Sequence, residues 1–351
     1  AIQLLVVDSV LIGFGYAFYK KKLPKFANKK IEFILNYETS KRVSLVTGVI
    51  ILSIYIGFTV PELFINEEEQ IQDFSVLKQA LELWPFGDSD DIYVKEQNDR
   101  YVRIFLLYVS QNIFQNIKPL PFIASILLVI LTYFFTYQIS HKRFAGLVAM
   151  VILLQHYTFL EYDTIAVYEN FWVLFYILSL YAIYKKWYLS SSLWYILSIF
   201  TKAFSASFVF MNMFFIYRSQ LTKKKKIISI VVYSVIILVA LSIFAFTETI
   251  YDELIRISAK EFWIGFTVFS YQLRFDHLFL LTLLPLIIGL ISTSKKGIRE
   301  ADSILVLILG VILAGPILVL FTDFYVILPY RFVPLLVFYS IGVGVFLSKK
   351  H

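Results

Sequence analysis

Residues 61–118 read PELFINEEEQIQDFSVLKQALELWPFGDSDDIYVKEQNDRYVRIFLLYVSQNIFQNIK and form the longest polar segment of the chain. The segment holds 11 of the 25 acidic residues, and an apolar run of membrane-spanning length lies on either side of it. A run of about 18 to 22 apolar residues is what a helix needs to cross roughly 30 Å of hydrocarbon. The pattern predicts a long loop between two membrane-spanning helices, and we expect the chemistry of the protein there.

The composition of the whole chain is typical of a membrane protein. Of its 351 residues, 59% are hydrophobic and 18% are aromatic, and the mean hydropathy is +0.75. In lipid only helices and closed barrels satisfy the backbone, and the apolar runs do not show the alternation of a barrel strand. We therefore predict an all-α, multi-pass membrane protein that forms a single domain over residues 1–351.

About eleven membrane-spanning helices are expected if one run forms a hairpin of two short passes. The apolar runs lie at residues 2–19, 43–60, 119–139, 143–160, 165–184, 188–200 with 204–217, 226–246, 276–293, 303–322 and 330–348. The first run, with the basic loop up to residue 42, is an additional amino-terminal span, and residues 43–348 form the core. The charges of that first run follow the apolar stretch, which is not typical of a signal peptide.

Basic residues indicate which loops share one side of the membrane. Six basic clusters fall on one side of this arrangement and hold 22 of the 32 Lys and Arg residues; they lie at residues 20–42, 142–143, 185–186, 218–226, 295–299 and 349–350. Lys and Arg accumulate in cytoplasmic loops, so the acidic loops are predicted on the outer or lumenal side of a plasma membrane or endoplasmic reticulum. The net charge of +7 then reflects topology and gives no support to nucleic-acid binding.

The acidic loop at residues 61–118 is not uniformly polar. Apolar residues recur every three or four positions around Asp73–Trp84 and around Tyr101–Ile113, which is the spacing of an amphipathic helix. Residues 85–91 between them contain Pro, Gly, Asp and Ser and indicate a turn. We expect two helices that lie along the membrane surface with their apolar faces toward the lipid.

Composition excludes some kinds of site and disfavours others. The chain has no cysteine, and its four histidines are scattered, so thiolate chemistry is excluded and a histidine-rich metal centre is disfavoured. A glycine-rich phosphate loop and an HExxH motif are also absent. Carboxylates suit Mg²⁺ or Mn²⁺, so a divalent cation is a candidate cofactor, although we assign no metal ligands.

Two isolated cations lie where the predicted spans meet the outer loops. Lys202 interrupts an apolar run at the expected hairpin turn, and Arg331 lies at the start of the last span. A charge at membrane depth costs about 2.5–3.5 kcal/mol, so it usually faces protein, water or a counter-ion. The alternative for both residues is a side chain that extends to the membrane surface as an anchor.

The order and side of these features resemble the GT-C class of integral-membrane glycosyltransferases, which includes protein O-mannosyltransferases and relatives that use a polyprenyl-phosphate sugar. The stretches that carry the similarity are QIQDF at 70–74, EYDTIAVYENFW at 161–172, TK at 201–202 and LPYRFVP at 328–334. The chain departs from the family in two ways. The DSD at 88–90 lies far from the early span, and the additional first span has no obvious counterpart.

The resemblance implies transfer of a sugar from a polyprenyl-phosphate donor to a hydroxyl or amide of a protein, lipid or glycan acceptor on the outer face. It also implies that this chemistry usually runs without a metal. A carboxylate would remove the acceptor proton, and cations would hold the departing phosphate. The expected residues are the catalytic carboxylates Asp73, Asp88, Asp90 and Asp163, the phosphate-binding cations Arg331 and Lys202, and the acceptor-side residues Glu161, His156 and Tyr168. Asp73 is the first choice for the base.

Two other functions remain open from the sequence. A transporter or flippase for a lipid-linked substrate would place paired ionisable residues deep within several spans and would show an internal repeat. Few deep charges and no repeat are found, which disfavours this function. A non-catalytic subunit of a membrane complex would pack its aromatic faces against partner membrane proteins, and the loop acids would then be solvated charges.

Overall fold

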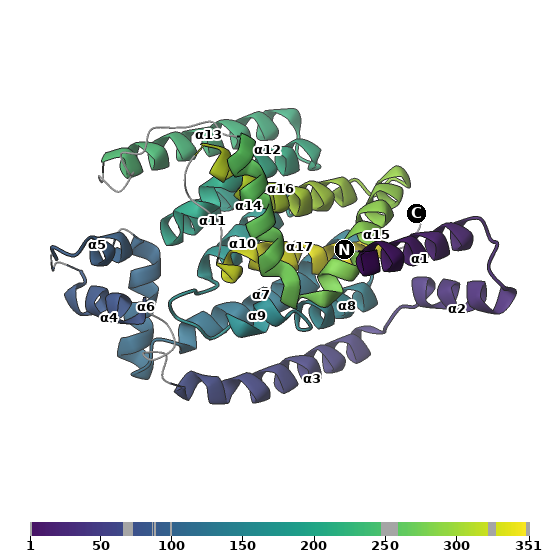
Figure 1. The fold of residues 1–351 in the computed structure, drawn as a ribbon, viewed down its shortest axis with the longest axis horizontal. Helices are drawn as coiled ribbons and strands as arrows, with labels where there is room; N and C mark the ends of the chain where they lie inside the picture. Colours follow the sequence, from purple (N-terminus) through teal and green to yellow (C-terminus); the bar gives the residue numbers. More distant parts are fainter. Residues whose placement is uncertain are drawn as a thin grey trace.

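The structure, a computed structural model, describes residues 2–65, 73–85, 87, 89–98, 100–246, 259–321 and 328–348. Every regular element within these ranges is a helix, and no strand is present in them. In Figure 1 the long helices α3, α7 and α13 run roughly along the long axis of the molecule. The predicted all-α class is thus confirmed for the described residues.

The helices follow one another along the chain with short connections. The α-helices are α1 (Ile2–Tyr19), α2 (Lys25–Asn36), α3 (Lys41–Thr59), α4 (Phe74–Leu83), α5 (Ile92–Asn98), α6 (Tyr101–Phe114), α7 (Pro119–Ser140), α8 (Arg143–Leu153), α9 (Tyr157–Glu161), α10 (Phe171–Tyr184), α11 (Tyr188–Thr201), α12 (Val209–Arg218), α13 (Lys223–Phe246), α14 (Ala259–Gln272), α15 (His277–Lys295), α16 (Glu300–Phe321) and α17 (Val333–Phe346). The 3₁₀ helices are η1 (Val60–Phe64), η2 (Ala203–Phe208), η3 (Leu273–Phe275) and η4 (Pro329–Phe332).

Several helices have the length and composition of membrane spans. In the part of the chain that the structure describes, five qualify: Lys41–Phe64, Pro119–Ser140, His277–Lys295, Glu300–Leu320 and Pro329–Phe346. Four shorter apolar helices accompany them: Val6–Tyr19, Arg143–Leu153, Phe171–Tyr184 and Ala203–Arg218. These helices indicate a membrane protein.

The span predicted at residues 143–160 is wrong as one continuous helix. α8 ends at Leu153, and α9 begins at Tyr157 after His156, whose backbone is extended (φ −82°, ψ 120°). The next predicted span also begins later than expected, at Phe171. Between α9 and α10 the chain carries most of the polar residues that the sequence singled out in this region. The predicted break at Lys202 is confirmed, since α11 ends at Thr201 and η2 begins at Ala203.

Helix α17 lies at the centre of the bundle and packs against α7, α8, α15 and α16. Its close approach to α7 depends on Gly344. A β-carbon at that position would lie 2.2 Å from Thr136 Cγ2 and 2.8 Å from the carbonyl oxygen of Ala145. A side chain there would force the helices apart, so the central packing requires glycine.

Helices α4 and α6 confirm the two helices predicted in the acidic loop, and part of the apolar surface of each is buried in protein, whereas Phe105 and Ile113 of α6 are exposed. Leu77 of α4 and both Ile104 and Leu107 of α6 are fully buried within the protein core. Figure 1 shows α4, α5 and α6 grouped at one end of the molecule. The buried part of the apolar surface of α6 packs against protein, because α6 lies against α7 and α11.

Loops that carry charge of the same kind meet at two ends of the bundle. On the basic side, Arg143 pairs with Glu38 at 3.6 Å, and Tyr184 Oη donates to the carbonyl of Gln138 at 2.7 Å. On the acidic side, Thr164 Oγ1 in the loop before α10 donates to Glu62 Oε2 in η1 at 3.4 Å. Loops that the sequence assigned to one side therefore contact one another in the structure. We call the two ends the basic end and the acidic end.

Candidate functional site

Two cations converge on one tyrosine at the acidic end. Lys202 follows α11, and its Nζ donates to Tyr330 Oη at 2.8 Å although 128 residues separate them. The same Nζ lies 4.1 Å from the centroid of the Tyr330 ring. Arg331 Nε also donates to Tyr330 Oη, at 3.4 Å. The cations that the sequence predicted as one pair are thus brought together around a single hydroxyl.

The cation Lys202 is buried with few opposite charges around it. Its exposed fraction is 7%. Burial lowers the pKa of Lys202 to about 8, while Tyr330 and Glu169 act in the opposite direction. An incoming anion such as a phosphate would favour the charged ammonium form, because opposite charge nearby offsets desolvation.

Three tyrosines form an aromatic wall beside these cations. The rings of Tyr168 and Tyr330 are stacked, with centroids 4.3 Å apart and planes at 14°. Tyr162 meets both rings edge-on, at 5.7 Å from Tyr168 and 5.9 Å from Tyr330. The pKa of Tyr162 and that of Tyr168 are both raised to about 12, mainly by burial. Both hydroxyls therefore stay protonated and can donate hydrogen bonds.

A buried ion pair holds the loop that carries Tyr168. Arg103 Nε lies 2.9 Å from Glu169 Oε2, and both side chains are 1% exposed. Arg103 also donates through Nη2 to the carbonyl of Val167 at 2.8 Å and through Nη1 to Gln97 Oε1. Burial raises the pKa of Glu169, and Arg103 opposes that shift. Helices α5 and α6 therefore fix the position of the loop between α9 and α10.

Asp163 lies in the same loop and is also buried, with 1% of its surface exposed. Its Oδ2 accepts a hydrogen bond from Tyr55 Oη of α3 at 2.7 Å, and its carbonyl accepts one from Ser125 Oγ of α7 at 2.8 Å. Burial raises the pKa of Asp163 to about 8; the hydrogen bond from Tyr55 opposes this shift, and the charge of Glu62 adds to it. At neutral pH the Asp163 carboxyl is therefore mostly protonated.

Glu62 stands beside Asp163 and was not singled out in the sequence analysis. It lies in η1, directly after α3, where Thr164 Oγ1 donates to Glu62 Oε2 at 3.4 Å. Lys118 Nζ donates to the backbone carbonyls of Glu62 at 3.0 Å and Ile65 at 2.7 Å, which fixes this turn. The signal in the sequence is the Pro61-Glu62 pair immediately after an apolar run. The sequence analysis looked for a pair of acidic residues after the early span, and Glu62 is a single glutamate there.

The two carboxyl groups differ in environment. Asp163 is enclosed by α3 and α7, whereas Glu62 is partly exposed. Two nearby carboxyl groups do not both ionise easily, and the more buried one keeps its proton. Glu62 is therefore the member of the pair that is suited to accept a proton.

The predicted carboxylates of the acidic loop have different placements. Asp73 is exposed at the start of α4; burial is the main cause of the raised pKa of Tyr168, and the charge of Asp73 adds to it. Asp90 is exposed in the turn before α5. Its neighbour Asp91 has a structural role, because its Oδ1 accepts from the backbone N–H of Tyr93 at 2.8 Å. Asp88 lies outside the described residues.

Glu161 links the carboxyl groups to the aromatic wall. It is exposed at the end of α9 and hydrogen-bonds with Tyr157, whose pKa it raises. Burial is the largest cause of the raised pKa of Tyr162, and the negative charge of Glu161 is the second largest. The predicted acceptor-side residues Glu161 and Tyr168 thus lie in one cluster with the cations. The third predicted acceptor-side residue, His156, has other neighbours.

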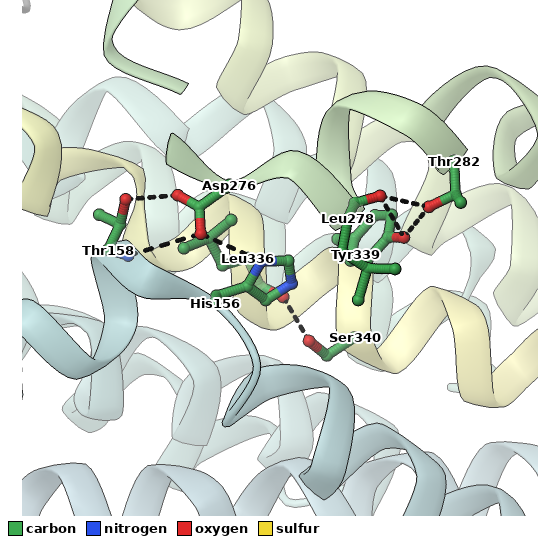
Figure 2. A network of polar contacts seen from close by, with 8 residues as sticks. All are labelled: His156, Thr158, Asp276, Leu278, Thr282, Leu336, Tyr339 and Ser340. Atoms are coloured by element: carbon green, nitrogen blue, oxygen red, sulfur yellow. Dashed lines mark hydrogen bonds and ion pairs between the residues drawn. The ribbon is translucent and has the colours of Figure 1, made fainter. Parts of the chain in front are cut away.

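His156 belongs to a separate buried network, which Figure 2 shows. Its Nδ1 lies 3.3 Å from Asp276 Oδ1, and both side chains are fully buried. Asp276 also accepts hydrogen bonds from the backbone N–H of Thr158 at 3.4 Å and from the Thr158 hydroxyl. The His156 ring meets the Tyr339 ring edge-on at 5.4 Å. This network joins the start of α9 to the start of α15, and we assign it a structural role.

The raised pKa of Asp163 predicts a pH dependence of stability. Its pKa rises from 3.8 to about 8 on folding, so the native state binds the extra proton between these values and the unfolded state does not. Stability contributed by this group therefore falls as pH rises from about 4 to 8. In Asp163→Asn this dependence should be reduced, whereas the exposed Asp90→Asn should keep it. Denaturant unfolding at several pH values measures the difference, and equal pH slopes for wild type and Asp163→Asn would contradict it.

Neither a metal site nor a related protein indicates the function of this cluster of cations, tyrosines and carboxyl groups. Among the described residues, no group of three His, Asp or Glu side chains lies close enough to hold a metal ion. No protein-family model matches the chain, and no match was found among curated proteins or among solved structures. The function has to be argued from the arrangement of the side chains.

Proposed function

We propose that this chain is a membrane glycosyltransferase of the GT-C type. It would move a sugar from a polyprenyl-phosphate donor to a hydroxyl or amide of a protein, lipid or glycan on the acidic side of the membrane. One observation carries the proposal: the cations Lys202 and Arg331 meet at Tyr330, at the same end of the bundle as the carboxyl groups of Glu62 and Asp163. The fold is the helical GT-C architecture with about eleven passes.

The cations are suited to the phosphate of the donor. The transferred sugar leaves its lipid phosphate as the bond between them breaks, and negative charge develops on the phosphate oxygen. Lys202 Nζ and the Arg331 guanidinium, both near Tyr330 Oη, would stabilise this charge. The Tyr168 ring stacked on Tyr330 offers an apolar face beside them.

A carboxylate is suited to the proton of the acceptor. We place the general base at Glu62, because Asp163 next to it keeps its proton at neutral pH and Glu62 is partly exposed. Asp73, the base expected from the sequence, is the alternative, because it is exposed and its negative charge acts on Tyr168. The two assignments differ in which single substitution abolishes transfer.

This proposal also distinguishes the enzyme from a transporter. The ionisable groups described above gather at one end of the bundle, as a surface reaction with a lipid-anchored donor requires. A transporter would need them near the bilayer midplane. Purified chain in liposomes should transfer labelled sugar from a polyprenyl-phosphate donor to acceptor, and translocation of the donor without transfer would refute the proposal.

Lys202→Met should lower kcat/KM for the lipid-phosphate sugar by about 100-fold, because one of two phosphate-binding cations is lost. The measurement is transfer of labelled sugar in reconstituted liposomes at varied donor concentration. Lys295→Met, which changes an exposed lysine at the end of α15, is the matched control and should keep wild-type kinetics. Wild-type kinetics in Lys202→Met would show that Lys202 does not bind the phosphate of the donor.

A further inference from the structure

We propose a second site, at the basic end of the bundle, that binds a phosphate-bearing anion supplied by the headgroup of a membrane phospholipid. A cavity of about 250 Å³ lies where the loop between α10 and α11 meets the end of α12 and the start of α16. Since a water takes about 30 Å³ in the liquid, this volume can hold a phosphate group with several waters. The cavity is remote from the aromatic wall, because Tyr184 at its edge contacts the basic end of α7.

The cavity carries a net positive charge. Lys185, Lys186 and Arg218 line it, against one lining carboxylate, Glu300. Glu300 lies in the first turn of α16, where a negative side chain stabilises the helix dipole. Because Asp302 neutralises Arg218, the two lysines against Glu300 leave an excess of one positive charge, which favours an anionic ligand.

The two lysines are available to a ligand. In the described part of the chain, the ammonium groups of Lys185 and Lys186 have no carboxylate partner, whereas Arg218 pairs with Asp302. Lys185 Nζ lies 5.7 Å from the centroid of the Tyr181 ring, which leaves its hydrogen-bond donors unused. An ammonium group offers three donors, and a phosphate is a matching acceptor.

The backbone holds these lysines in place. α10 ends with Lys186 in the left-handed conformation, at φ 66°. The N–H groups of Lys186 and Trp187 donate to the carbonyls of Ile183 at 2.9 Å and Ala182 at 2.8 Å, which closes the helix. The cations are thus presented from an ordered helix end, and binding costs less conformational entropy than in a mobile loop.

The surroundings favour a lipid as the source of the phosphate. Two large aromatic side chains beside the cavity are exposed, Trp187 at 60% and Tyr217 at 66%. Exposed Trp and Tyr in membrane proteins lie at the level of the lipid headgroups. Lys226 Nζ donates to the carbonyl of Tyr217 at 2.5 Å, so the lysine run at the start of α13 adds positive charge to the same region. Basic pockets at this level between membrane helices bind anionic headgroups.

Native mass spectrometry of the full chain in detergent tests the site. The protein is first equilibrated with phosphatidylglycerol or with phosphatidylcholine, and retained lipid is counted. Wild type should retain phosphatidylglycerol preferentially. Lys185→Gln/Lys186→Gln should weaken its binding by about 30-fold, since each lysine near the surface contributes about 1 kcal/mol. Lys295→Gln/Lys296→Gln removes the same charge from exposed positions outside the cavity and should retain the lipid.

The outcomes separate the lipid from other sources. Equal retention of the two lipids, or full retention by the Lys185/Lys186 variant, would overturn the proposal. A titration of delipidated protein with inorganic phosphate forms the second arm. Tight binding of phosphate that displaces phosphatidylglycerol would overturn the lipid as the source and assign a soluble phosphate compound instead. None of these readouts uses sugar transfer, so the result is independent of the proposed enzyme activity.

Discussion

Glu62→Gln should lower the rate of sugar transfer by about 100-fold to 10,000-fold, the range typical of a lost general base. The change keeps the size and one oxygen of the side chain, so the hydrogen bond from Thr164 can persist. The neutral amide cannot accept the acceptor proton. Because the loss concerns the chemical step, kcat should fall while KM for the donor changes little.

The same assay assigns the base by comparison. Glu82→Gln is the matched control, because Glu82 is an exposed glutamate of α4 and should transfer sugar as the wild type does. If Asp73→Asn abolishes transfer and Glu62→Gln does not, the base is Asp73. If both variants keep full activity in a well-folded protein, neither carboxylate is the base and the mechanism proposed here is wrong.

Arg103→Met should destabilise the protein by about 3–5 kcal/mol. The substitution leaves the Glu169 carboxyl buried without its guanidinium partner, and an uncompensated buried charge is costly. It also removes the donor to the Val167 carbonyl, so the loop with Asp163 and Tyr168 loses its anchor. We expect lost transfer activity at the same time. The measurement is the free energy of unfolding in mixed detergent micelles, with circular dichroism used to monitor the loss of helix.

Two variants show whether burial of the charge is the cause. Arg103→Met/Glu169→Met removes both partners and should recover much of the lost stability, because no charge then remains buried alone. Arg143→Met is the control on a more exposed pair, since Arg143 and Glu38 are 32% and 26% exposed, and it should cost only about 0–1 kcal/mol. Equal losses in Arg103→Met and Arg143→Met would show that burial does not set the cost.

Most of the helices could be predicted from the sequence, whereas the side of the membrane on which each loop lies stays a prediction. Apolar length and the positions of Lys and Arg act locally, because each segment must satisfy its own backbone and its own insertion energy in lipid. The break at Lys202 was predicted from a charge within an apolar run, and the helices around 73–84 and 101–113 were predicted from the spacing of apolar residues. What failed was the packing. α4 and α6 bury part of their apolar surface in protein, and the run at 143–160 is broken before α9.

The candidate site could be predicted only in part. The structure brings the predicted cations Lys202 and Arg331 together at Tyr330, while Asp163 is bound to Tyr55; the roles assigned to these residues stay predictions. Glu62 looked like one of many loop acids, and His156 looked like a site residue although it pairs with Asp276. An acid's role depends on which groups enclose it, and those come from segments far away along the chain.

The sequence by itself thus determined the helical class and the apolar segments that indicate a membrane protein, and it favoured an acidic and a basic side. Only the tertiary structure decided which carboxyl groups and cations share a site. The hydrogen bond between Tyr55 and Asp163 spans 108 residues, and that between Lys202 and Tyr330 spans 128. Partition into lipid is settled segment by segment, whereas pairs such as these form only when helix packing brings distant segments together.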